Sequence, residues 1–126
     1  MLSVPISNGE LIDKITILLI KKERIHDKEK LLHVANELAV LEPLQEKIVS
    51  DEKVSKLKHE LKNINMQLWD VEDELRDKER KKEFDTTFIE LARKVYFTND
   101  KRSQLKLEIN KLSNSELVEV KSYEEY

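Results

Sequence analysis

The stretch that decides the fold is residues 54–112, VSKLKHELKNINMQLWDVEDELRDKERKKEFDTTFIELARKVYFTNDKRSQLKLEINKL. Residues at alternating steps of three and four form two series, Val54, Leu57, Leu61, Ile64, Leu68, Val71, Leu75 and Phe88, Leu91, Val95, Thr98, Arg102, Leu105, Ile109, Leu112. Such spacing is typical of the a/d seam of coiled-coil helices. Residues 83–86 separate the two series. We therefore predict an antiparallel hairpin with helices over about 52–82 and 87–112.

Working outward, local signals mark where these two helices begin. Asp51 follows Ser50 at a break in the apolar pattern and is the predicted N-cap of the first long helix. Thr87 and Glu90 have the spacing of a capping box, which predicts the start of the second long helix. Residues 70–83 contain many acids and bases, several of them paired four residues apart, as on a solvated helix tip.

Another capping box, Ser7-Asn8-Gly9-Glu10, precedes a segment rich in isoleucine and leucine. We predict a helix from Glu10 to about Ile25 that contacts neighbours on two sides, because its apolar arc is wide. Isoleucine also favours strands, so a strand is the alternative. The cap and the helical spacing of the apolar residues favour the helix.

A second N-terminal helix is predicted from an apolar stripe of Leu31, Val34 or Ala35, Leu38, Leu41 and Ile48. Pro43 lies within it and should kink or split the helix, because proline lacks an amide hydrogen and clashes one turn back. A new short helix over residues 42–49 is the alternative.

These elements predict an all-α fold. We expect an antiparallel helical bundle built on the long hairpin, with the two N-terminal helices packed across it. The whole chain, 1–126, is expected to be one helical domain, with an extended N-terminal arm over 1–9 and a non-helical tail over 114–126.

Composition narrows the function classes. The chain has 126 residues, of which 39% are charged and 39% hydrophobic, one glycine, two prolines and no cysteine, and its net charge is −3. Mixed charges give no basic face for nucleic acid. No apolar run is long enough for a membrane span, and no signal peptide is evident, so we expect a cytoplasmic protein.

No cofactor or metal is predicted. Cysteine is absent, so there is no thiolate ligand and no thiol nucleophile. His26, His33 and His59 lie on three separate segments without a partner at helical spacing, which argues against a zinc site. A single glycine also argues against a phosphate-binding loop.

Thr98 and Arg102 are the two polar members of the second series and its most informative feature. A hairpin that turns near residue 85 places Thr98 opposite Glu72, and Arg102 opposite Leu68 or Trp69. A buried arginine requires a partner. The predicted polar cluster is Glu72, Asp73, Arg76, Arg93, Tyr96, Asn99, Asp100 and Arg102.

This cluster has two interpretations. In the structural one, Arg102 pairs with Glu72 or Asp73 and fixes the register of the hairpin. In the functional one, the arginines line a pocket for a small anionic ligand. Should the turn lie elsewhere, these residues would simply be exposed.

Trp69 and Tyr123 are candidate interface residues. Trp69 is the only tryptophan, and its simpler interpretation is an anchor of the bundle core, with the interface role as the alternative. Tyr123 lies in the tail, which could pack back on the bundle, contact a partner or be disordered.

The chain resembles a family of small all-helical bacterial and phage proteins of unknown function. The resemblance is carried by residues 7–18, by Asn65–Trp69 with Glu72, Asp73 and Arg76, by residues 88–102 and by residues 116–123. It implies a free-standing domain of this length and marks the same polar residues, but it implies no reaction. The first helix is also weakly similar to the opening helix of the all-helical chorismate mutases, which bind a dicarboxylate between arginines.

From the sequence we expect a non-catalytic helical module for protein–protein interaction or self-association, most simply as a homodimer. The alternative is a small anionic-ligand-binding protein or a small helical enzyme that uses the polar cluster.

Overall fold

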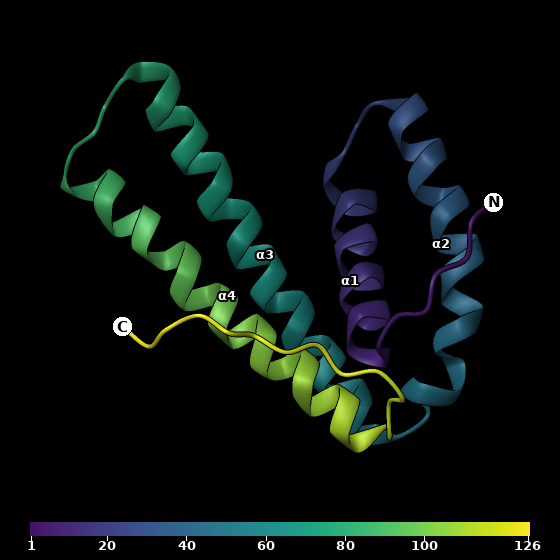
Figure 1. The fold of residues 1–126 in the computed structure, drawn as a ribbon. Coiled ribbons are helices and arrows are strands. Elements are labelled where there is room, and N and C mark those ends of the chain that lie inside the picture. Colours follow the sequence, from purple (N-terminus) through teal and green to yellow (C-terminus); the bar gives the residue numbers. More distant parts are fainter.

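The computed structural model describes residues 1–126 and is all-α. Its four helices are α1 (Asn8–Arg24), α2 (Lys28–Val49), α3 (Glu52–Lys81) and α4 (Thr86–Leu112). Figure 1 shows two hairpins, α1–α2 and α3–α4, that meet at one end and diverge toward the other. The predicted all-α bundle with its long C-terminal hairpin is therefore confirmed, and α1 is a helix along its whole length.

Side-chain caps start each helix. Ser7 accepts a hydrogen bond from the amide of Glu10, and Asp51 accepts one from Lys53, as predicted. The cap of α4 is Asp85, which accepts from the amide of Phe88; the prediction of Thr87 was wrong. Asp85 is the better cap here because its carboxylate also binds Lys78 across the turn, at 2.8 Å.

Helix α2 is continuous across Pro43, so the predicted split does not occur. Proline removes only one backbone hydrogen bond, and packing of the helix on α1 offsets that loss. The contacts come from one side of α2, where only Val34, Leu38 and Gln45 are buried.

Two apolar clusters form the core, and α1 contributes to both. Leu11, Ile15 and Leu18 pack against Val34 and Leu38 of α2. On its other side, Ile12 packs with Val54, Leu57 and Leu61 of α3 and Ile109 of α4. Helix α1 is therefore the central element, which accounts for the wide apolar arc of its sequence.

The α3–α4 hairpin extends beyond the end of α1. Arg24 in the last turn of α1 pairs with Asp70 of α3 at 2.5 Å, and residues beyond Asp70 project away from the N-terminal hairpin (Figure 1). The projecting tip carries exposed ion pairs such as Arg76–Glu72 and Lys81–Asp77. Exposed pairs of this kind contribute little to stability.

The tail, Ser113–Tyr126, contains no helix and runs back along α4 (Figure 1). None of the four helices combines the length and the apolar character that crossing a bilayer requires.

Candidate functional site

A buried carboxylate lies at the centre of the molecule. Asp13 is on α1, and only 1% of it is exposed. Both of its carboxylate oxygens accept hydrogen bonds from Arg102 of α4, Oδ1 from Nε at 2.9 Å and Oδ2 from Nη2 at 2.5 Å. This bidentate geometry is the strongest that an arginine and a carboxylate form.

Asn65 of α3 completes this group. Its Nδ2 donates to Asp13 Oδ1 and to Thr16 Oγ1, both at 2.9 Å. The Thr16 hydroxyl donates in turn to the backbone carbonyl of Asp13 at 2.7 Å. We call Asp13, Thr16, Asn65 and Arg102 the Asp13 cluster. It joins α1, α3 and α4 through side chains whose hydrogen bonds are mutually satisfied.

Electrostatics keep Arg102 charged. Its hydrogen bonds to Asp13 raise the pKa of the Arg102 guanidinium, although partial burial acts in the opposite direction. The Asp13 cluster therefore contains a bidentate ion pair between Asp13 and Arg102.

One turn before Asp13, the start of α1 contacts the backbone of α4. The amide of Gly9 donates to Asn110 Oδ1 at 2.6 Å. A Cβ atom on residue 9 would lie 2.4 Å from the carbonyl oxygen of Lys106. The only glycine of the chain is therefore required by the close approach of the two helices.

Lys106 carries a second ion pair in this region. Its Nζ lies 2.6 Å from Glu10 Oε2 and 3.4 Å from Glu119 Oε2 of the tail. Burial lowers the pKa of Lys106, but its hydrogen bond to Glu10 and the charges of the nearby acids produce a net rise. The pKa values of the two adjacent acids shift in opposite directions. Hydrogen bonding to Glu10 raises the pKa of Glu119. At Glu10, burial raises the pKa, but hydrogen bonds to Glu119 and Lys106 outweigh burial, so the pKa of Glu10 falls.

The tail reaches an aromatic patch halfway along α4. Lys121 and the hydroxyl of Tyr126 both contact Asp100. The Tyr126 ring packs edge-on against Tyr96 and Phe97, with centroid distances of 5.3 and 4.9 Å. Together with the Glu119 contact, these interactions fix the tail against the outer side of α4.

Of the predicted cluster, only Arg102 belongs to the Asp13 cluster. Its predicted pairing with Glu72 or Asp73 was wrong, because Asp13 of α1 occupies that place. Asp13 Oδ1 accepts from both Asn65 and Arg102, so these two residues lie at the same level of the hairpin, about one turn from the predicted register.

The other predicted residues lie elsewhere. Glu72 and Arg76 form an exposed pair at 3.5 Å on α3, and Asp73 is exposed beside them. The Arg93 guanidinium lies over the Phe97 ring at 5.8 Å. Tyr96 and Asp100 bind the tail, Asn99 and Trp69 are half-buried, and Tyr123 is 85% exposed.

Sequence reasoning missed Asp13, Thr16, Asn65, Glu10 and Lys106. Two of them could have been found as polar residues in apolar positions. Asp13 interrupts the isoleucine-rich face of α1, and Asn65 follows Leu61 by one turn on the inner side of α3. Residue spacing relates Arg102 only to acids of its own hairpin, and it contains no information on how α1 crosses that hairpin.

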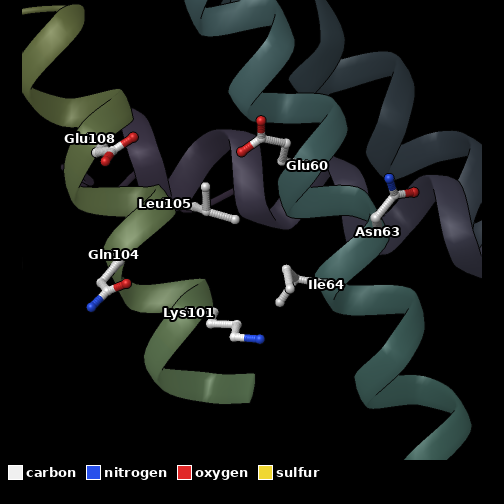
Figure 2. A pocket seen from close by; sticks show the side chains of 7 residues that line it. All are labelled: Glu60, Asn63, Ile64, Lys101, Gln104, Leu105 and Glu108. Atoms are coloured by element: carbon white, nitrogen blue, oxygen red, sulfur yellow. The ribbon is translucent and has the colours of Figure 1, made fainter. Parts of the chain in front are cut away.

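A shallow groove of about 370 Å³ lies on the face of the hairpin opposite α1. Figure 2 shows Lys101 and Leu105 of α4 pointing toward Glu60 and Ile64 of α3 across it, while Gln104 and Asn63 point away from it at its edges. None of the predicted site residues lines this groove. No group of three or more His, Asp or Glu side chains has the arrangement of a metal site.

Comparison with known proteins was consistent with the resemblance seen in the sequence. The sequence profile of a family of unknown function, DUF6165, matches residues 2–126. The chain belongs to this family. No curated protein and no solved structure matches the DUF6165 chain. Membership in DUF6165 therefore covers nearly the whole chain, including the Asp13 cluster and the tail, and assigns no activity.

Proposed function

We propose that this protein is a non-catalytic helical module whose function is to associate with a second copy of itself. The supporting observation is the amount of surface that the chain leaves open to solvent. Its accessible area is 9225 Å². A compact monomer of 15.0 kDa would expose about 7,000 Å².

The excess, roughly 2,000 Å², is on the scale of the area that one subunit contributes to an obligate homodimer. It arises from the arrangement in Figure 1, in which the two hairpins diverge and the N-terminal arm and the tail extend over the surface. Large apolar side chains form part of it, including Leu32 and Leu44 of α2, which are 60% and 61% exposed.

The polar groups also favour association over chemistry. The carboxylate of Asp13 and the guanidinium of Arg102 bind each other, and Lys106 is held by Glu10. Their positions link helices to one another, so their role in the chain is to fix the shape that displays the outer surfaces.

Light scattering coupled to size-exclusion chromatography tests this proposal. We expect a mass twice that of the chain, 15.0 kDa, at micromolar concentration and above. A mass that equals one chain at every concentration would overturn the proposal.

A further inference from the structure

Helix α2 is the least polar of the four helices on average, yet it buries only three residues. A helix of a globular protein normally turns its apolar residues toward a neighbour. In Figure 1, α2 lies at the edge of the molecule, with α1 and the base of α3 on its inner side.

The outward side of α2 is a continuous uncharged strip. Leu32, Asn36, Val40 and Leu44 follow one another at intervals of one turn, and they are flanked by the exposed residues Ala35, Ala39 and Pro43. We call these seven residues the outer α2 face. Leu32, Val40 and Leu44 are 60%, 45% and 61% exposed. The small residues near its middle would allow close approach of a second helix.

Opposite charges mark the two ends of this strip. Glu29 lies in the first turn of α2 and Lys47 in the last turn, and both are exposed. Lys28 and Glu46 repeat the arrangement with the signs reversed. None of the four takes part in an ion pair within the chain, whereas Arg102 and Lys106 of α4 both do.

This pattern is complementary to itself in only one direction. If two α2 helices packed in parallel, Glu29 would face Glu29 and Lys47 would face Lys47. If they pack antiparallel about a twofold axis, residues that lie equally far from the middle of the contact, on opposite sides of it, face each other. Glu29 of each copy then faces Lys47 of the other, and Leu32 faces Leu44.

We propose that two copies of this chain associate through the outer α2 face, antiparallel, with Glu29 of each copy paired with Lys47 of the other. This inference rests on the proposed function and names its contact. The uncharged centre supplies the apolar burial, and the charged ends set the direction and exclude the parallel arrangement.

Charge reversal tests the direction of packing. Glu29→Lys alone and Lys47→Glu alone each replace two attractions with two repulsions, and we expect each to weaken the dimer by about tenfold. In a mixed dimer of the two variants, a lysine of one copy faces a glutamate of the other at both ends of the contact. We therefore expect mixed dimers to form in preference to either homodimer, as read by native mass spectrometry.

Cross-linking tests the contact itself, since the chain contains no cysteine. Ala39 lies close to the twofold axis, so Ala39→Cys should form a disulfide-linked dimer under mild oxidation. Glu79→Cys, at the exposed hairpin tip, is the matched control and should remain monomeric on denaturing gels. Equal cross-linking of the two variants would overturn the inference.

Leu32→Glu separates the possible failures. Leu32 is mostly exposed, so the variant should keep the helical content of the wild type by circular dichroism and lose its dimer. If the wild type is a monomer, the proposed function fails together with this contact. If the wild type is a dimer that Leu32→Glu and both charge reversals leave intact, self-association stands and the α2 contact is wrong.

Discussion

At the scale of residues, the fold depends on a charge placed inside it. A carboxylate that is almost fully buried is costly unless it is paired with a cation and hydrogen-bonded. Asp13 meets that condition through the two bonds from Arg102 and the one from Asn65. Because these partners come from α3 and α4, the same bonds specify where α1 lies on the long hairpin.

Substitution of Asp13 by Asn should expose this dependence. The variant leaves Arg102 without a counter-charge in a half-buried position, and we expect the free energy of unfolding to fall by about 3 kcal/mol. Urea denaturation followed by circular dichroism measures it. Asp73→Asn, on the exposed side of α3, is the control and should change stability by less than about 0.5 kcal/mol. Equal effects of the two variants would mean that the Asp13 cluster does not determine stability.

Substitution of Gly9 by Ala tests the close approach of α1 to α4. Alanine normally strengthens a helix, but here its Cβ would lie 2.4 Å from the Lys106 carbonyl, so the helices must separate. We expect a loss of about 1–3 kcal/mol in the same assay. Lys14→Ala, at an exposed position of the same helix, should be neutral or slightly stabilising. A stabilised Gly9→Ala variant would contradict the observed approach.

The sequence predicted that Arg102 faces inward but not what it binds. Its place in the apolar series is a local property, readable from spacing alone. The identity of its partner depends on how α1 crosses the hairpin, which is a tertiary relation between residues far apart. Asp13 was visible in the sequence as a charge in an apolar helix, and pairing it with Arg102 required the packing of three helices.

At the scale of elements, the helices were the predictable part. Caps at Ser7 and Asp51 and the apolar series of α3 and α4 placed the helix ends to within a few residues. Pro43 does not end α2, because local propensity is a weak constraint when one side of a helix is packed. The path of the tail could not be predicted, since its residues have no period and its contacts are with α4.

The docking of the tail should depend on pH. Hydrogen bonding to Glu10 raises the pKa of Glu119 above its ordinary value of 4.5. Protonated Glu119 therefore favours the docked tail. Its contribution to the free energy of docking is complete below pH 4.5 and is lost as the pH rises through the raised pKa. Glu10 has the opposite sign, and its contribution is lost only as the pH falls through its lowered pKa.

We accordingly expect the tail to be more ordered near pH 4.5 than at neutral pH. Heteronuclear ¹⁵N NOE values for residues 117–126 measure this order. Glu119→Gln mimics the protonated acid and should remove the dependence, whereas Glu124→Gln, which lies in the exposed part of the tail, should preserve it. A tail equally ordered at both pH values in the wild type would refute the prediction.

At the scale of the whole molecule, the large exposed area links stability to concentration. If two chains associate as proposed, unfolding is coupled to dissociation, and the melting temperature rises with protein concentration. For a dimer of this size, a hundredfold increase should raise it by about 5 °C. Differential scanning calorimetry measures the shift. In the Leu32→Glu variant the melting temperature should not change with concentration, and a concentration-independent wild type would argue against the dimer.

The ion pair between Asp13 and Arg102 also has a consequence for biosynthesis, because 89 residues separate its members. During translation, the helix that carries Asp13 leaves the ribosome on the order of ten seconds before Arg102 does. Until then α2 and α3 can cover its isoleucines only in part, because Ile109 of α4 is still missing from the core, and its carboxylate lacks the Arg102 guanidinium that it binds in the folded chain. The nascent chain therefore completes its fold only near the end of synthesis, and ribosome-bound intermediates truncated before α4 should be the species that chaperones recognise.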